Sequence, residues 1–166
     1  MELIHRPIDF VADREYVLER HCRINYACDS PWATEISYDE YREQYFAMVD
    51  YMNKFWDEFE DGAKDTRTIA EIVENEAGDK VAYLWVAFHE EQASGFSYAD
   101  VQDIYVEEEY RQMGIASQLM EYAEEKAKEN GVKVIRSGTG IGNTKSFGLH
   151  NKLGYHQYRY EFEKLL

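Results

Sequence analysis

Apolar residues recur at helical spacing in the first third of the chain. Asp9 or Asp13 would cap a first helix. The run from Ser37 to Glu40 has the pattern of a capping box, and it opens a longer helix that we expect to end at Gly62. The apolar positions of the first helix are Val17, Leu18, Cys22 and Ile24, and those of the second form one stripe: Tyr38, Tyr41, Tyr45, Val49, Met52, Trp56 and Phe59.

The middle of the chain shows the patterns of strands instead. Residues 75–79, which contain Gly78, predict a hairpin turn. Residues 81–88 are almost continuously apolar, as in a strand buried on both faces, and a polar loop over 90–97 follows them. The strands expected up to this point lie within 1–10, where Leu3 and Ile4 are the apolar content, and over 67–74, 81–88 and 99–106.

The last third of the chain alternates between helix and strand. A helix is expected over 115–130 with Gly131 after its end, and Asn143 would cap a short helix that includes His150. Further strands are expected over 132–135 and, after Gly154, over 155–158 and 160–162. Antiparallel hairpins followed by a strand–helix–strand crossover predict an α/β fold with a mixed sheet.

Composition and charge narrow the class of protein. The chain has 166 residues, of which 45% are apolar, so we expect one domain over residues 1–166 with its own core. The net charge is −15, which argues against nucleic acid or an anionic membrane as partner and favours cationic ones. No apolar run approaches the ~20 residues of a membrane span, and the first residues lack a secretory pattern. We therefore expect a cytoplasmic protein in which Cys22 and Cys28 are free thiols.

The passage from the strand that ends at Val106 into the helix that begins at Ile115 is the most informative about chemistry. Backbone N–H groups at the start of a helix have no intrahelical partner, and the helix dipole adds partial positive charge there. Such a junction can hold a pyrophosphate without lysine side chains. Gly114 lets the backbone approach a phosphate closely, and Ala116 keeps the start of the helix small.

Two segments carry a family resemblance. The run from Arg111 to Ala116 resembles the (Q/R)-x-x-G-x-(G/A) acyl-CoA motif of the GNAT superfamily of N-acetyltransferases, and the run from Asn143 to Tyr155 is similar to that family's second signature. The specific resemblance covers residues 99–158. It implies a mixed central sheet with helices on both faces, acetyl-CoA as co-substrate and no metal. The residues that would bind the cofactor are Tyr105, Val106, Arg111, Gln112, Met113, Gly114, Ile115, Ala116, Ser117 and Asn143.

The resemblance also implies roles on the strand. The backbone N–H near Val106 would polarise the thioester carbonyl. Asp103 stands where many members of the family carry a carboxylate that acts as base, sometimes through water; substrate binding and a structural hydrogen bond are the alternatives. A period of two would place Asp103 on one strand face together with Val101 and Tyr105.

His150 occupies the position where the family most often has a tyrosine that acts as acid toward the departing thiolate. An imidazole can also give up a proton near neutral pH. Tyr105, Tyr155 and a purely structural His150 are the alternatives. Residues 138–142 read G-x-G-x-G, which does not match a dinucleotide fingerprint, so they would form either a turn before Asn143 or a loop beside the pantetheine arm.

These features together imply transfer of an acetyl group from acetyl-CoA to a primary amine of a cationic small molecule, by direct attack in a ternary complex. Acetylation of protein lysines or N-termini is one alternative, and a non-catalytic acyl-CoA-binding sensor is another. A homodimer is left open. The acidic run over 57–61 would either be a solvated helix end or rim the acceptor site.

Overall fold

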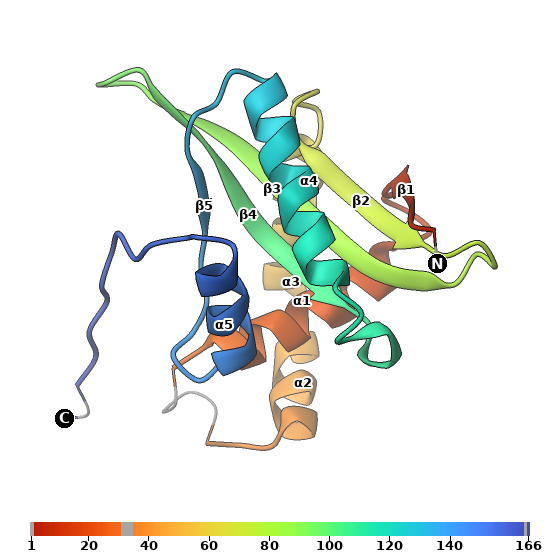
Figure 1. Cartoon of the computed structure of the whole chain (residues 1–166). Helices are drawn as coiled ribbons and strands as arrows, with labels where there is room; N and C mark the ends of the chain where they lie inside the picture. Colours follow the sequence, from red (N-terminus) through yellow and green to blue (C-terminus); the bar gives the residue numbers. More distant parts are fainter. Residues whose placement is uncertain (1, 31–34, 165) are drawn as a thin grey trace.

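The computed structural model describes residues 2–30, 35–164 and 166. Within these residues five strands form one sheet in the order β1–β2–β3–β4–β5 (Figure 1). Neighbours are antiparallel from β1 to β4, whereas β5 is parallel to β4, so the predicted α/β fold with a mixed sheet is confirmed. The strands are β1 (Ile4–Pro7), β2 (Ile69–Glu74), β3 (Lys80–Glu91), β4 (Phe96–Val106) and β5 (Ile135–Ser137).

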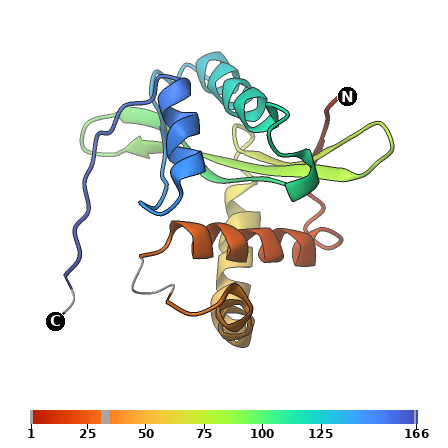
Figure 2. The same ribbon diagram turned by 60° about the horizontal axis from the view of Figure 1, so that its bottom comes forward.

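Helices cover both faces of this sheet, as expected. In Figure 2, α4 and α5 lie on one face, and α1, α2 and α3 lie on the other. The crossover from β4 to β5 runs through the short helix η1 and through α4. The helices are α1 (Arg14–Cys28), α2 (Tyr38–Ala47), α3 (Val49–Gly62), η1 (Glu108–Tyr110), α4 (Ile115–Glu129) and α5 (Thr144–Lys152).

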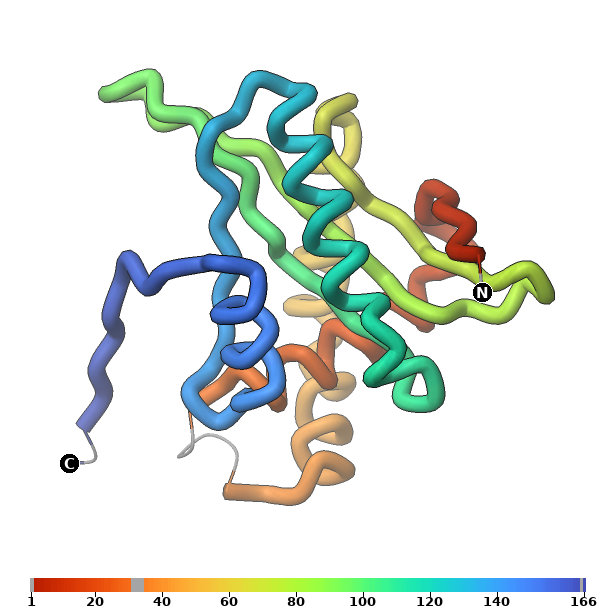
Figure 3. The backbone as a smooth tube through the Cα atoms, in the orientation of Figure 1, coloured from red at the N-terminus to blue at the C-terminus, as the bar shows by residue number. Residues whose placement is uncertain are grey.

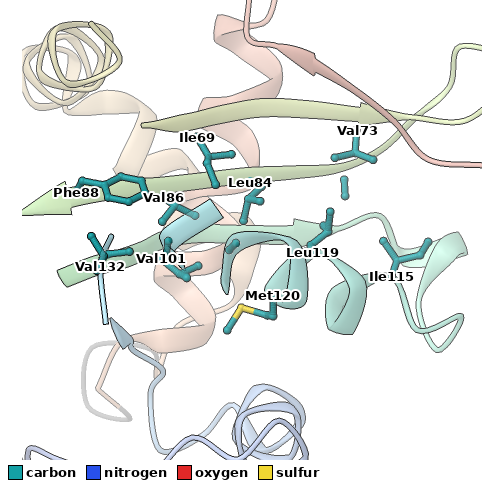
Figure 4. Packing of buried hydrophobic residues seen from close by; sticks show 14 of the residues in the cluster. Ile69, Val73, Leu84, Val86, Phe88, Val101, Ile115, Leu119, Met120 and Val132 are labelled. Atoms are coloured by element: carbon teal, nitrogen blue, oxygen red, sulfur yellow. The ribbon is translucent and has the colours of Figure 1, made fainter. Parts of the chain in front are cut away.

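Each face of the sheet has its own hydrophobic core, because alternate residues of the central strands point to opposite sides. This explains the continuous apolar run over 81–88, which is buried on both faces as predicted. Burial of each large side chain contributes about 1.5–3 kcal/mol. The core under α4 includes Leu84, Val86, Ile115, Leu119 and Met120 (Figure 4), and the core under α1 and α3 includes Val17, Leu18, Phe59, Ile72 and Tyr83.

The single helix predicted over 38–62 is wrong in one respect, because it is broken into α2 and α3 at Met48. This residue has ψ 63°, outside the helical range, and its N–H donates to the carbonyl of Tyr45 in a tight turn. The break lets α2 pack Tyr45 on Cys22 while the far end of α3 packs Phe59 against the sheet. One continuous apolar stripe is compatible with a single helix and with two helices, so the spacing of apolar residues could not reveal the break. Ser37 does cap α2, accepting from the N–H of Glu40.

The start of α1 also differs from the prediction. Asp13 precedes the helix, but its side chain makes no cap hydrogen bond. Its buried carboxylate instead accepts hydrogen bonds from the guanidinium of Arg6, the ammonium of Lys80 and the N–H of Asp9. Asp9 accepts from the N–H groups of the two residues before Asp13 and shapes the turn before the helix. Asp13 therefore ties α1 to β1 and β3.

The predicted strand pair over 155–158 and 160–162 is not formed. Residues 155–164 have no regular secondary structure, and Figure 3 shows this tail running away from the helices. The guanidinium carbon of Arg136 lies 4.8 Å from the centroid of the Tyr158 ring, whereas Phe162 is 93% exposed. Apolar alternation can make a strand only where it finds a partner strand. The strand predicted over 132–135 is shifted to β5, and β3 and β4 extend into the loop predicted over 90–97.

Candidate functional site

The edge of β4 opens at the point where its pairing with β5 ends. The two strands pair from Ala99 to Val101, opposite Ile135 to Ser137. On its other edge, β4 contains an irregularity at the same place, because Asp103 is opposite Trp85 but Val101 is opposite the next residue of β3. Gln102 is therefore the extra residue of a β-bulge. Beyond it, β4 continues without β5 beside it.

The bulge decides where the Asp103 side chain points. Val101 packs in the core under α4, whereas Tyr105 packs in the core under α1. Asp103 bonds to Tyr83 and to His21 of α1, so it lies on the α1 face with Tyr105. The prediction that Val101 shares this face is therefore wrong. An extra residue reverses the alternation of side chains, and nothing in the local sequence announces it.

Asp103 is buried in a small polar cluster. One oxygen, Oδ2, is 2.7 Å from Nδ1 of His21 and 2.8 Å from the hydroxyl of Tyr83, which donates to it. Asp103 is 3% exposed and His21 is 9% exposed. The His21 ring also stacks on Phe55, with centroids 3.9 Å apart. His21 was not among the site residues predicted from the sequence. The available signal was a histidine four residues after Val17 on the apolar face of a helix.

The loop before α4 has the geometry expected for an anion site. Gln112 and Gly114 have φ of 64° and 82°, in the left-handed region that suits glycine. The first helical hydrogen bond of α4 runs from the N–H of Gln118 to the carbonyl of Gly114, and no side chain caps the helix. The N–H groups of Ile115, Ala116 and Ser117 thus lack intrahelical partners. These residues fit a phosphate-bearing ligand.

The end of β4 directs a backbone N–H, that of Val106, toward the open edge of the strand. The N–H of Glu107 donates to the carbonyl of Val81 on β3. Because N–H groups alternate between the two edges of a strand, the N–H of Val106 points to the edge that β5 has left. Arg111 extends back to this point, where its Nε donates to the carbonyl of Val106 and its guanidinium lies 5.2 Å from the ring of Tyr105.

The segment after β5 contacts the end of α1. A Cβ atom on Gly140 would lie 2.3 Å from the carbonyl oxygen of Cys28, so this backbone touches the end of α1. The Cys28 thiol also lies 3.9 Å from Oγ1 of Thr139. Asn143 caps α5 by accepting from the N–H of Ser146, as predicted. Residues 138–142 therefore form a loop that is held against the end of α1.

Two clefts are lined by neighbours of Asp103 and His21, although neither of these two residues lines a cleft itself. Tyr105 lines the first cleft, of about 600 Å³, and Tyr45, whose ring centroid is 6.3 Å from that of His21, lines the second, of about 330 Å³. The first is rich in charges: Tyr16, Glu19, Arg20, Arg23, Asp79, Lys80, Tyr105, Glu107, Glu108, Glu109 and Tyr110. The second, the tyrosine cleft, is lined by Asn25, Cys28, Asp29, Tyr41, Tyr45, Met48 and Tyr51.

The tyrosine cleft holds one carboxylate, that of Asp29, among aromatic rings. Burial raises the pKa of Tyr41 to about 12, and burial also raises the pKa of Tyr45, so both hydroxyls keep their protons at neutral pH. The hydroxyl of Tyr45 is buried without a hydrogen-bond partner among the described residues. Aromatic faces with one carboxylate suit a small organic cation.

His150 lies on α5 and has a separate set of contacts from Asp103. Its Nδ1 lies 2.7 Å from the carbonyl of Ser146, so this nitrogen carries the hydrogen and donates. Its Nε2 is buried without a partner among the described residues, and its ring meets Tyr155 edge to face at 5.3 Å. Burial, with the nearby Glu124 carboxylate, raises the pKa of Tyr155. His150 and Tyr155 thus adjoin each other, and neither is bonded to Asp103.

The acidic run over 57–61 lines neither cleft. Asp61 pairs with Lys64 at 2.8 Å, and Glu58 lies 3.8 Å from Lys54 on exposed helix surface. The run over 57–61 is therefore a solvated helix end. The carboxylate at the tyrosine cleft is that of Asp29. Across the described residues, no group of His, Cys, Asp and Glu side chains could hold a metal ion. None of the helices described is long and apolar enough to cross a membrane.

Residues 32–155 match the model of the Acetyltransferase (GNAT) family. No curated protein matches the chain. Among solved structures, aminoglycoside antibiotic 6'-N-acetyltransferase AAC(6')-Ih from Acinetobacter baumannii is similar at 19% identity and a TM-score of 0.65, with 99% of each chain covered.

Two further solved structures bear on the ligands. AAC(6')-Iy, in complex with the bisubstrate analog CoA-S-monomethyl-acetylneamine, is 16% identical with a TM-score of 0.65, covering 100% of this chain and 99% of that one. Ribosomal-protein-alanine N-acetyltransferase from Brucella melitensis biovar Abortus 2308 is 15% identical with a TM-score of 0.63, covering 99% of this chain and 100% of that one. At these identities the likeness shows the fold.

Proposed function

The chain belongs to the GNAT family of acetyltransferases, and we propose that it moves an acetyl group from acetyl-CoA to a primary amine of a cationic small molecule, in a ternary complex. It is therefore an acyltransferase. Acetyl-CoA supplies a thioester whose carbonyl carbon is the electrophile. The observation that carries the proposal is the junction at which Gly114, with φ 82°, opens the uncapped α4 next to the free edge of β4.

The residues of this junction fit the parts of acetyl-CoA. The free N–H groups from Ile115 to Ser117 would hold the pyrophosphate at the positive end of the helix dipole. The N–H of Val106 would receive the thioester oxygen, since it faces the edge that β5 has left. The other residues that we assign to the acetyl-CoA site are Tyr105, Arg111, Gln112, Met113, Gly114 and Asn143.

The acceptor amine would enter by the tyrosine cleft. Its volume of about 330 Å³ suits a small molecule or one side chain, and Asp29 and the rings of Tyr41, Tyr45 and Tyr51 would attract a cation. One solved neighbour named above is an aminoglycoside antibiotic 6'-N-acetyltransferase, and another is in complex with the bisubstrate analog CoA-S-monomethyl-acetylneamine. These facts support a cationic small-molecule acceptor.

His150 stays our predicted acid toward the departing sulfur. Because Nδ1 of His150 donates to the carbonyl of Ser146, only the protonated imidazolium could donate a proton from Nε2. Tyr155 is the adjacent alternative, because its hydroxyl lies in the same buried contact. We keep Asp103 at the proposed reaction centre. Its oxygen Oδ2 already accepts hydrogen bonds from His21 and Tyr83.

The experiment that tests this proposal measures CoA release from acetyl-CoA with a panel of polyamines, aminoglycosides, amino acids and peptides, and identifies each acetylated product by mass spectrometry. We expect turnover of cationic small amines, and Asp29→Asn should raise their KM about tenfold at an unchanged acetyl-CoA KM. Asp57→Asn, on the exposed end of α3, is the matched control. Turnover of peptides alone would favour a protein acetyltransferase, and tight acetyl-CoA binding without any transfer would favour a sensor.

A further inference from the structure

His21 and Asp103 form a histidine–carboxylate pair. On α1, His21 lies between Arg20, which lines the charged cleft, and Asn25, which lines the tyrosine cleft. We propose that His21, oriented by Asp103, is the group that takes the proton from the ammonium of the acceptor. The proposal rests on the proposed acetyl transfer, because it assigns a step of that reaction to a residue. It also assigns Asp103 a different part, that of a positioning residue.

The hydrogen bond to Asp103 fixes which nitrogen of His21 can act. A carboxylate oxygen only accepts, so Nδ1 of His21, 2.7 Å away, carries the hydrogen. The lone pair of the neutral ring is then on Nε2, which forms no hydrogen bond to the residues that the structure describes. Stacking on Phe55 holds the plane of the ring. His21 thus presents a basic nitrogen in a fixed orientation.

Asp103 is poorly placed to take the proton itself. It is 3% exposed, and its Oδ2 already accepts from both His21 and Tyr83. A substrate ammonium would have to displace one of these donors to reach that oxygen. The same bonds make Asp103 effective at stabilising an imidazolium beside it, because the negative charge lies in a buried site that water does not screen.

The surroundings of His21 leave few other groups that can change charge. Asp103 faces it from β4, Tyr83 bonds to the same carboxylate from β3, Tyr45 faces it from α2, and α3 contributes the uncharged ring of Phe55. Burial raises the pKa values of Tyr83 and Tyr45, so both stay protonated near neutral pH. Cys22, the neighbour on α1, is buried, and its pKa is raised as well.

His21 lies on the face of α1 that runs from the tyrosine cleft toward the open edge of β4. His21, Asn25 and Cys28 are spaced by four and three residues, so they lie on one face of the helix. Asn25 and Cys28 line the tyrosine cleft, and Cys28 touches the loop after β5. An amine bound in that cleft therefore lies along the helix face that leads to His21, beside the strand whose free edge would hold the thioester.

The proton balance of the reaction is then complete. His21 Nε2 takes one proton from the ammonium and later passes it to solvent. The freed lone pair on nitrogen forms the C–N bond as the C–S bond breaks and its electron pair leaves on sulfur. The second proton lost by the nitrogen goes to that sulfur, through His150 or water. One amide, one thiol and one released proton result.

The test compares two histidines that each pair with a carboxylate. His21→Asn keeps an N–H that can donate to Asp103 but removes the basic Nε2. His5→Asn is the matched control, because His5 bonds to Glu71 at 2.8 Å between β1 and β2, away from both clefts. The acceptor is the panel amine that the wild type acetylates fastest. We expect His21→Asn to lower kcat about 100-fold or more, with acetyl-CoA affinity changed less than about twofold, and His5→Asn to leave both unchanged.

Two further readouts separate proton transfer from structure. In the wild type, kcat should depend on pH through the proton that His21 takes up, and His21→Asn should lose that dependence. In ¹⁵N NMR spectra of the wild type without ligands, His21 should show a protonated Nδ1 and an unprotonated Nε2, a result that does not depend on any variant's folding. A wild-type rate and pH profile in His21→Asn, or a protonated Nε2 in the neutral ring, would overturn the proposal. Absence of acetyl-CoA binding to the wild type would instead overturn the proposed function.

Discussion

Val101 and Asp103 lie two residues apart on β4, yet their side chains are on opposite faces of the sheet. The bulge at Gln102 produces this arrangement. It coincides with the last pair between β4 and β5, so one irregularity both turns Asp103 toward α1 and marks the start of the open edge. The polar cluster and the open edge of β4 thus share a single structural origin.

The hydroxyl of Tyr83 is the second donor that holds Asp103. Tyr83→Phe should lower the free energy of unfolding by about 1–2 kcal/mol, because a buried charged acceptor loses a hydrogen bond. It should lower kcat less than His21→Asn does, because the imidazole keeps its own bond to Asp103. Urea unfolding and steady-state kinetics measure the two effects. Tyr158→Phe, at an exposed tyrosine, is the control, and equal behaviour of the two variants would contradict the role of Tyr83.

The acid role of His150 makes a distinct prediction. His150→Phe should lower kcat more than it weakens acetyl-CoA binding, because the proton is needed only as the sulfur departs. His150→Tyr should retain much of the activity, since the phenol can donate from a similar place. Steady-state kinetics, with calorimetry for acetyl-CoA, distinguish the effects. A wild-type rate in His150→Phe would leave this residue only its contacts with Ser146 and Tyr155.

The contact between Gly140 and Cys28 predicts an unusual sensitivity to one methyl group. Gly140→Ala would place its Cβ 2.3 Å from a backbone carbonyl oxygen, so the loop must move away from α1. We expect a loss of about 1–3 kcal/mol in stability, together with weaker acceptor binding. Gly142→Ala is the control, because a Cβ there meets nothing within 4 Å. Thermal unfolding and acceptor KM measure both, and two indistinguishable variants would mean that the loop is not held against the helix.

Asp13 predicts how stability depends on pH. Burial alone would raise the pKa of Asp13, but hydrogen bonds from Arg6 and Lys80 outweigh it and hold the pKa below its ordinary value of 3.8. The carboxylate is therefore stabilising above about pH 4, where the unfolded chain is also ionised, and this contribution is lost as pH falls further. Asp13→Asn should cost about 3 kcal/mol at pH 7, and the gap to the wild type should narrow below pH 4. Urea unfolding at both pH values checks this, and a gap independent of pH would contradict it.

The elements defined by strong local signals were predictable from the sequence. The helix that begins after Gly114, the cap at Asn143 and the doubly buried strand over 81–88 each depend on nearby residues, and the structure contains all three. The loop at Gly114 could also be predicted from the sequence as a candidate anion site, because that prediction depends only on the backbone and on one glycine.

Features that depend on tertiary contacts were not predictable. The break at Met48, the bulge at Gln102 and the missing strands after Gly154 follow from which partners a segment finds in the fold. His21 shows the consequence for the site. It lies 82 residues from Asp103 in the chain, so its pairing could appear only once α1 was packed against β4.

The most direct test of the account is a calorimetric titration of acetyl-CoA into the wild type, Gly114→Val and Gly62→Val. Gly114 adopts a φ of 82°, which a β-branched residue resists, and its backbone would lie against the pyrophosphate. Gly62, at the end of α3, is a control because a Cβ there meets nothing within 4 Å. We predict that Gly114→Val, while still folded, binds acetyl-CoA more than about tenfold more weakly than the wild type, and that Gly62→Val binds it equally well. Unchanged affinity in folded Gly114→Val would contradict the assignment of this loop as the acetyl-CoA site.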